Sequence, residues 1–373
     1  MNEPSGRVVL FGATGYTGEL TARAMARRGL APVLAGRRRD ALEKLAGDLG
    51  GLDVAVADVA DPHSVRELVG RGDVLVSTVG PFARWGGAAL DAAVAAGAHY
   101  VDSTGEPPFV RRVFEEASTP AADAGSLLLT AMAYDWVPGN LAGGLALRDA
   151  GAAATAVRIG YFTKGGGMGG MSGGTRASAL GVLLEPSFQF RGGRVVIERG
   201  ARKVHSFAIG GRPRPAISVG TSEAYSLPRA FAGISDVEVY LGWFGSHSRP
   251  MQAFSLAGAG LSRLPGARAA LRAATGRFVK TSTGGPDDEA RAATGSRFVA
   301  EALSATGEVL ATARLEGVNG YTFSGESLAW AAATTAAGGA TGTGALGPVE
   351  AFGLDQLEAG VSECGVDRVQ ETA

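Results

Sequence analysis

The chain has 373 residues, a formal net charge of −1 and charged side chains at 19% of its positions. This length suits two domains, or one domain with a large insertion, and the balanced charge gives no reason to expect nucleic acid or an anionic membrane as a partner. The single cysteine, Cys364, excludes an intramolecular disulfide and a cysteine-based zinc site. The polar start of the chain leaves no room for a signal peptide, and no apolar run reaches about 18 residues. We therefore expect a soluble, cytoplasmic protein without a transmembrane segment.

From residue 7 to about residue 131, short apolar runs alternate with amphipathic segments, which is the pattern of a doubly wound α/β domain. The near-continuous hydrophobicity of the runs predicts parallel strands that are covered on both faces. We expect strands at 7–12, 32–36, 53–57, 73–77, 99–102 and 126–131, and helices at 17–28, 40–49, 62–69, 87–96 and 109–117. Right-handed crossovers bring the carboxyl ends of these strands to one edge, where a ligand crevice is expected.

A glycine-rich turn follows the first predicted strand. Its sequence, GATGYTG, contains Gly12, Thr14, Gly15, Tyr16, Thr17 and Gly18. In a dinucleotide fold the first glycine permits a tight turn, the second lets the backbone approach a pyrophosphate, and the third lets the helix pack close to the strand. The N–H groups and the dipole of the helix that begins here attract the phosphates. We therefore predict that these six residues bind the cofactor.

The end of the second predicted strand indicates which dinucleotide binds. A site for NAD places Asp or Glu here, because a carboxylate accepts hydrogen bonds from the ribose 2′-hydroxyl. This chain has three consecutive arginines instead, at 37–39, and guanidinium groups bind a 2′-phosphate through charge-assisted hydrogen bonds. We therefore predict NADP as the cofactor, with Arg37 and Arg38 on the phosphate and Arg39 on a solvated helix start.

Further cofactor contacts are expected where later strands end. Asp58 follows the third strand, in a place suited to hydrogen-bonding an adenine amino group or, alternatively, to a carboxylate in a turn. Gly80 and Pro81 form a bend after the fourth strand that takes the chain past the nicotinamide ribose or, alternatively, is an ordinary turn between a strand and a helix. Phe82 either packs on the nicotinamide ring or belongs to the core.

Polar side chains after the fifth and sixth strands are candidates for substrate chemistry. Asp102 and Glu106 point to the same sheet edge, and either can instead pair with an arginine or cap the next helix. Tyr134 can donate a proton to the atom that becomes anionic after hydride addition. Its neighbour Asp135 is a candidate cap for the following helix.

The pattern changes after residue 150, where polar-interrupted, hairpin-like runs predict a mostly antiparallel sheet with a few helices. Strands are expected at 157–163, 194–197, 203–209, 237–244, 297–303 and 309–317, and a helix at 252–274, broken at Pro265. We expect a Rossmann domain at 1–140, a substrate domain at 141–345, and a C-terminal segment at 346–373 that returns to the first domain. The predicted fold class is thus α/β, a doubly wound parallel sheet followed by an α+β domain.

The most unusual sequence in the chain is a glycine-rich segment in the predicted second domain. Five glycines fall within residues 164–170, and a helix is expected to start near Ser172 with Thr175 on an adjacent face. The glycines permit a loop that approaches a ligand or moves as a lid, and the alternative is a surface connection. Because hydroxyl groups converge there with Arg176, we expect Ser172 and Thr175 to contact the substrate.

The sequence contains no motif typical of metal-dependent enzymes, serine hydrolases or phosphoryl-transfer enzymes. The four histidines lack paired metal-ligand spacing, and neither a GxSxG elbow nor a GxxxxGK[ST] phosphate loop occurs. We therefore expect no metal site, no serine hydrolysis and no phosphoryl transfer.

Taken together, the motifs resemble those of saccharopine dehydrogenase-like oxidoreductases. The resemblance rests on GATGYTG at 12–18, AGR at 35–37, STVGPF at 77–82, YVDSTGE at 100–106, YDWVP at 134–138 and MSGGTRAS at 171–178. It is closest to the bacterial branch that includes trans-acting enoyl reductases of lipid and polyketide assembly. The resemblance implies a Rossmann domain joined to an α/β substrate domain, NADPH as cofactor, and a homodimer formed through the second domain, which makes 141–345 the substrate and dimerisation domain.

These observations predict an NADPH-dependent reductase that transfers hydride to a C=C bond conjugated to a carbonyl, in a small molecule or an acyl thioester. A saccharopine-forming enzyme must bind several carboxylates, whereas the segment near Ser172 offers only Lys164 and Arg176. Tyr134, Ser172 or Thr175 is expected to donate the proton or bind the carbonyl oxygen. The first alternative is reduction of an imine formed from an amine and a 2-keto acid, and the second is an NADPH-binding partner protein without turnover.

Overall fold

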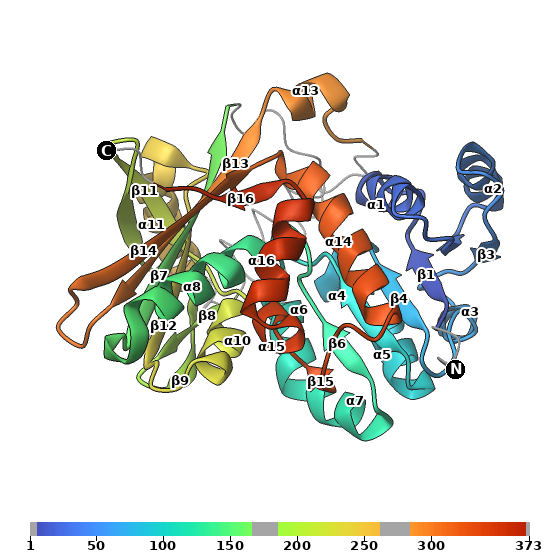
Figure 1. Ribbon diagram of the computed structural model, residues 1–373, viewed down its shortest axis with the longest axis horizontal. Helices are drawn as coiled ribbons and strands as arrows, with labels where there is room; N and C mark the ends of the chain where they lie inside the picture. Colours follow the sequence, from blue (N-terminus) through green and yellow to red (C-terminus); the bar gives the residue numbers. More distant parts are fainter. Residues whose placement is uncertain (1–5, 166–185, 262–283, 371–373) are drawn as a thin grey trace. The chain divides into compact units, whose positions relative to one another are not determined.

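The computed structural model describes residues 6–165, 186–261 and 284–370. The chain divides into two compact units, each with its own sheet (Figure 1). The first unit comprises Met1–Gly105, Phe109–Val137 and Gly320–Gly365, and the second comprises Glu106–Pro108, Pro138–Asn319 and Val366–Ala373. Ser172 and Thr175, and the predicted glycine-rich loop before them, lie outside the described residues.

A seven-stranded parallel sheet forms the centre of the first unit, in the order β15-β6-β5-β4-β1-β2-β3. The strands are β1 Val8–Phe11, β2 Val33–Gly36, β3 Val54–Val56, β4 Val74–Ser77, β5 His99–Asp102, β6 Leu127–Leu129 and β15 Gly344–Ala345. All six strands expected here are present. Strands β1 and β4 are buried along their whole length, as the continuous apolar runs predict for strands covered on both faces.

Helices cover this sheet. They are α1 Tyr16–Arg27, α2 Arg39–Asp48, α3 Pro62–Arg66, α4 Phe82–Trp85, α5 Gly87–Ala96, α6 Pro107–Arg112, the π-helical turn η1 Val113–Ala117, α7 Ser118–Ala124, α14 Gly320–Ala336, α15 Pro348–Phe352 and α16 Leu354–Glu363. The chain leaves β1 towards β2 and leaves β4 towards β5, in opposite directions along the sheet. Right-handed crossovers therefore place α1 and α5 on opposite faces.

Helix α14 belongs to the first unit, whereas the sequence prediction assigns residues 320–345 to the second domain. It packs against α1 and contacts β1, β4 and β5 (Figure 1). Small residues permit this close approach, since a Cβ on Gly325 would come within 3.0 Å of the carbonyl carbon of Leu20. Buried residues occur all around α14, which is typical of a helix packed on several sides.

The second unit contains a nine-stranded sheet in the order β10-β11-β12-β7-β13-β14-β16, in which β8 also pairs with β12, and β9 pairs with β8. The strands are β7 Ala156–Lys164, β8 Pro186–Arg191, β9 Arg194–Arg199, β10 Val204–Ile209, β11 Arg212–Ser218, β12 Asp236–Leu241, β13 Gly295–Leu303, β14 Val309–Gly317 and β16 Val366–Arg368. Strands β7 and β12 run parallel, and the other described pairs are antiparallel. The predicted fold class is confirmed.

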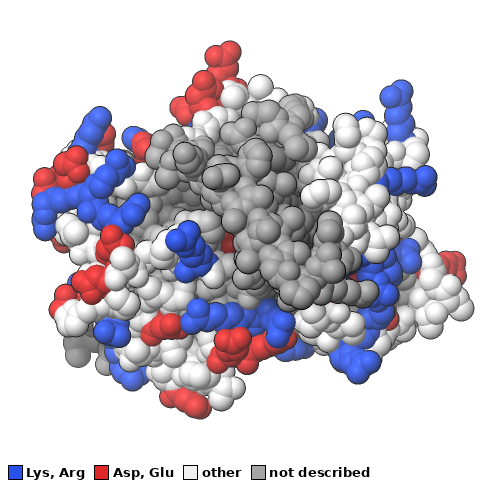
Figure 2. Space-filling model, turned by 180° about the vertical axis from the view of Figure 1, so that it is seen from behind, with Lys and Arg blue, Asp and Glu red and all other residues white. Residues whose placement is uncertain are grey.

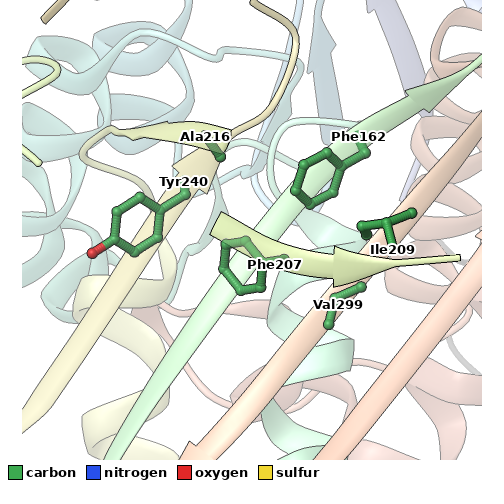
Figure 3. Close-up of a cluster of buried hydrophobic side chains, with 6 residues drawn as sticks. All are labelled: Phe162, Phe207, Ile209, Ala216, Tyr240 and Val299. Atoms are coloured by element: carbon green, nitrogen blue, oxygen red, sulfur yellow. The ribbon is translucent and has the colours of Figure 1, made fainter. Parts of the chain in front are cut away.

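The described helices of this unit are α8 Val137–Ala150, η2 Gly151–Ala153, α10 Glu223–Ala230, η4 Gly245–His247, α11 Ser248–Leu261 and α13 Asp288–Ala292. Helix α11 begins four residues before the expected helix at 252–274, and the rest of that prediction falls outside the described residues. An apolar cluster packs on one face of the sheet (Figure 3), formed by Phe162, Phe207, Ile209, Ala216, Tyr240 and Val299. This cluster gives the second unit a core of its own.

Basic and acidic side chains are interspersed over the face of the molecule shown in Figure 2, in keeping with the net charge of −1. Among the described helices, none is both long enough and apolar enough to cross a membrane. The described residues also contain no group of three His, Cys, Asp or Glu side chains placed to hold a metal ion.

Candidate functional site

The glycine turn lies where the strand order of the first sheet reverses, between β1 and β4. In doubly wound sheets this switch point forms the ligand crevice. Gly12 has a φ of +91°, and its carbonyl oxygen accepts a hydrogen bond from the Gly15 N–H at 2.9 Å. A Cβ on Gly18 would lie only 2.1 Å from the same oxygen. Helix α1 can therefore begin close against the turn only because residue 18 has no side chain.

The start of α1 has the properties of a pyrophosphate site. Its N-cap residue is the exposed Gly15, which has no side chain that could cap the first N–H groups of the helix. The first N–H groups of a helix have no intrahelical partner and attract anions. Thr14 Oγ1 lies 3.9 Å from the position that a Cβ on Gly36 would occupy, which places the glycine turn beside the end of β2. These residues fit a dinucleotide that runs from the turn to β2.

The arginines after β2 differ in their partners. The Arg39 guanidinium pairs with Glu43 one helical turn later, at 3.6 Å. The exposed side chains of Arg37 and Arg38 make neither an ion pair nor a hydrogen bond with the residues that the structure describes. Two free guanidinium groups at this strand end fit a 2′-phosphate, which supports the prediction that Arg37 and Arg38 bind it.

The other predicted cofactor contacts have structural partners of their own. The Asp58 carboxylate accepts a hydrogen bond from the Ala60 N–H at 2.9 Å, which favours the turn interpretation that the sequence left open. Gly80 and Pro81 form an exposed bend with a cis peptide bond. Phe82 is buried, with its ring centroid 5.6 Å from that of Phe109, which favours the core interpretation. Contact of these residues with a cofactor stays a prediction.

Asp102, at the end of β5, is a buried hydrogen-bonding centre. Its carboxylate accepts bonds from the Thr104 and Ala131 N–H groups, at 2.9 and 2.8 Å, and from the Thr130 hydroxyl at 2.8 Å. Burial raises its pKa to about 6, against the opposing effect of these donors. Ala131 has a φ of +61°, an uncommon conformation for a residue with a side chain. Asp102 therefore holds the loop after β6 in place.

Tyr134 lies in that loop and is held by α14. Its backbone N–H donates a hydrogen bond to Ser324 Oγ at 3.2 Å. Its ring lies against Gly320, where a Cβ would come within 2.8 Å of Cδ2. On the same helix, the Tyr321 ring meets the edge of the Tyr16 ring at 5.2 Å. Helix α14 thus contacts both the glycine turn and the loop of Tyr134.

Sequence reasoning missed Gly320, Tyr321 and Ser324 because it placed them in the second domain. A signal was present, since residues 320–336 are rich in small and apolar side chains on all sides. A helix of that kind must be covered by other elements. Cys364 is buried, and burial raises the pKa of its thiol to about 12. A buried thiol of this kind is a packing residue rather than a nucleophile.

The parallel doubly wound sheet with a glycine turn at its switch point is typical of a dinucleotide-binding Rossmann unit. The two arginines at the end of β2, which have no partner among the described residues, favour NADP over NAD. Comparisons with known proteins agree with this class. The family described as saccharopine dehydrogenase NADP binding domain matches residues 8–129. Residues 8–129 thus match the saccharopine dehydrogenase NADP-binding domains, which confirms the predicted family resemblance and NADP as the cofactor.

Two mycobacterial relatives are similar to part of the chain. A protein of Mycobacterium tuberculosis named as a trans-acting enoyl reductase is 37% identical over 192 residues, which cover 48% of this chain and 45% of the relative. The trans-acting enoyl reductase of Mycobacterium ulcerans is 36% identical over 140 residues, covering 36% of this chain and 34% of the relative. The chain thus matches less than half the length of these relatives.

A solved structure matches the fold over nearly the whole chain. It is the apo saccharopine dehydrogenase (L-Glu forming) of Saccharomyces cerevisiae, with a TM-score of 0.61, 12% identity, and coverage of 98% of this chain and 100% of that one. At this level of identity the likeness shows a shared fold.

Proposed function

We propose that the chain is an NADP-dependent oxidoreductase that uses NADPH to reduce a C=C bond conjugated to a carbonyl. The observation that carries the proposal is the pair Arg37 and Arg38, which have no partner among the described residues, in a domain that matches the NADP-binding family. They follow β2, next to the glycine turn and the open N-terminus of α1. The enoyl substrate is supported by the relatives named as trans-acting enoyl reductases. When bound, NADPH supplies the hydride, and the protein supplies binding, orientation and electrostatics.

Each part of the site has a proposed task. The glycine turn and the start of α1 bind the pyrophosphate, and Arg37 and Arg38 bind the 2′-phosphate. Tyr134, Ser172 or Thr175 donates the proton or binds the carbonyl oxygen of the substrate. The substrate is a small molecule or an acyl thioester, and the protein acts as a homodimer in the cytoplasm. Sedimentation of the purified protein tests the dimer.

The reaction is tested by NADPH oxidation with two substrate sets: 2-enoyl thioesters, and pairs of an amine with a 2-keto acid. Turnover with the enoyl set alone supports the proposal. Turnover with the second set alone replaces it with imine reduction. Tight NADPH binding without hydride transfer to either set replaces it with a non-catalytic NADPH-binding protein.

Arg37→Ala is expected to weaken NADPH binding by about 1.5–3 kcal/mol, because a charge-assisted hydrogen bond to the 2′-phosphate is lost. Binding of NADH, which lacks that phosphate, should change little. Calorimetric titration of the variant with each cofactor measures both effects. Arg39→Ala is the matched control, since Arg39 pairs with Glu43, and it should leave both affinities near those of the unaltered protein. Equal losses of NADPH and NADH affinity in Arg37→Ala would contradict the assignment.

A further inference from the structure

The loops after β5 and β6 contain two carboxyl groups in opposite situations. Asp102 uses both carboxylate oxygens to accept hydrogen bonds from the surrounding loop. Asp135 Oδ1 is buried, and the residues that the structure describes provide it with no hydrogen-bond partner and its side chain with no ion pair. Two carboxyl groups in such different environments take different roles. Asp102 has a structural role, because its hydrogen bonds hold the loops together. Asp135 has no structural role of this kind among the described residues.

The position of Asp135 depends on a glycine. A Cβ on Gly105 would come within 2.5 Å of Asp135 Oδ2 and 3.2 Å of its carboxyl carbon. The carboxyl group therefore rests on the bare backbone of the loop after β5. It also follows Tyr134, at the carboxyl edge of the parallel sheet where ligands of this fold bind. Among the described residues, the Asp135 side chain makes no capping hydrogen bond to α8. Asp135 is therefore not the helix cap that the sequence suggested.

A buried carboxyl oxygen without a partner is costly, by more in the charged form than in the neutral one. Burial raises the pKa of Asp135 to about 7. Asp102, which faces the same loop, has a raised pKa as well, and Tyr134 is the adjacent titratable group in the chain. No cation among the described residues counteracts the shift of Asp135. A neutral carboxylic acid differs from a carboxylate in one decisive respect, since it carries an O–H that can donate a hydrogen bond.

We propose that Asp135, in its neutral form, donates a hydrogen bond to the carbonyl oxygen of the substrate and stabilises the negative charge that this oxygen gains during reduction. This inference rests on the proposed function and adds a residue to it. Preorganised donors aimed at a developing oxyanion are among the largest contributions to enzymatic rates. Deprotonation of Asp135 would remove the donor and place a negative charge beside the oxyanion, so turnover is expected to fall as the pH rises.

The experiment compares the unaltered protein with Asp135→Asn, Asp135→Ala and the control Asp123→Asn, which makes the same chemical change at an exposed position of α7. The first readout is infrared difference spectroscopy without substrate at neutral pH. The unaltered protein and Asp123→Asn should show the carbonyl band of a protonated carboxylic acid that shifts in D2O. Both Asp135 variants should lose most of its intensity and keep only the smaller contribution of Asp102, whose pKa is about 6.

The second readout is the pH profile of kcat with an enoyl thioester, together with the Kd for NADPH. Asp135→Ala should lower kcat by about a hundredfold, the cost of one lost oxyanion donor, with little change in NADPH affinity. Asp135→Asn keeps an N–H donor, so it should retain more activity and lose the decline of kcat near pH 7 that the unaltered protein shows. Because Asp102 also titrates in this range, the loss of the decline in Asp135→Asn is what assigns it to Asp135.

If the unaltered protein is active and Asp135→Ala has the same kcat, the proposed role of Asp135 is wrong, while the proposed function stands. The same conclusion follows if Asp135→Asn keeps the infrared band at its full intensity or keeps the decline of kcat near pH 7. A folded, NADPH-binding protein that reduces no enoyl thioester overturns the proposed function, and with it this role. The two failures are therefore distinguishable.

Discussion

Replacing Gly18 with alanine is expected to destabilise the protein by about 2–3 kcal/mol and to abolish measurable NADPH binding. The new Cβ would lie 2.1 Å from the carbonyl oxygen of Gly12, 2.9 Å from its carbonyl carbon and 3.0 Å from that of Ala13. All three are backbone atoms, so no side-chain rotation can relieve the clash. Helix α1 must move away from the turn and take its free N–H groups with it. Urea unfolding and calorimetric titration with NADPH measure the two effects.

Gly47→Ala is the matched control for Gly18→Ala. Gly47 lies in α2, is exposed, and has no atom within 4 Å of the position of an added Cβ. Alanine lowers the entropy of the unfolded chain and favours helix, so this variant should be more stable by about 0.5–1 kcal/mol. The same substitution thus has opposite signs at two helical glycines. Equal effects at both positions would show that helix propensity, rather than the contact with Gly12, determines the role of Gly18.

The sheet of the first unit could be predicted because its information is local. A strand covered on both faces needs an unbroken apolar run, and Val8–Phe11 and Val74–Ser77 are such runs. The phosphate-binding half of the site is equally local, since the glycine turn and the arginine run are short segments at the ends of two neighbouring strands. Features that depend only on a short stretch of sequence, such as a buried strand or a glycine turn, can therefore be predicted from the sequence.

The placement of α14 could not be read from local pattern alone. Its residues follow β14 of the second unit in the chain, and a helix usually packs near the elements that precede it. What decides its place is the match between the surfaces of α14 and α1, including the contact of Gly325 with Leu20. That match involves residues about 300 positions apart. Tyr321 and Ser324 therefore joined the candidate site only once the structure was known.

The substrate side of the site depends on long-range contacts in the same way. Sequence reasoning identified Asp102 and Tyr134 as polar residues at the ends of strands, and left their roles open. The structure distinguishes them by partners that lie far away in the chain, such as Thr130 for Asp102 and Ser324 for Tyr134. Burial, which separates Asp102 from an ordinary capping carboxylate, is likewise a property of the assembled fold.

Replacing Asp102 with alanine is expected to lower the free energy of unfolding by about 3–5 kcal/mol at pH 7, since each buried donor left without a partner costs about 1–3 kcal/mol. The donors concerned are the Thr130 hydroxyl and the N–H groups of Thr104 and Ala131. Ala131, whose φ is +61°, would also lose the hydrogen bond that supports this uncommon conformation. Asp61→Ala is the matched control, because that exposed carboxylate accepts one helix-capping bond, and its loss should cost about 1 kcal/mol.

The change with pH of the stability difference between the unaltered protein and Asp102→Ala is a stricter test than the size of that difference at pH 7. The pKa of Asp102 is about 6 in the folded protein, above the ordinary value of 3.8 that it regains on unfolding. Between these two values the folded state binds more protons than the unfolded state, so the contribution of Asp102 to stability is fully present below pH 4 and declines as the pH rises to about 6. The gap between the unaltered protein and Asp102→Ala should therefore widen, by up to about 3 kcal/mol, when the pH falls from 7 to 4. Urea unfolding of both proteins at several pH values measures the gap. A gap that narrowed on acidification would mean that the carboxylate of Asp102 is stabilised by its donors more than it is penalised by burial.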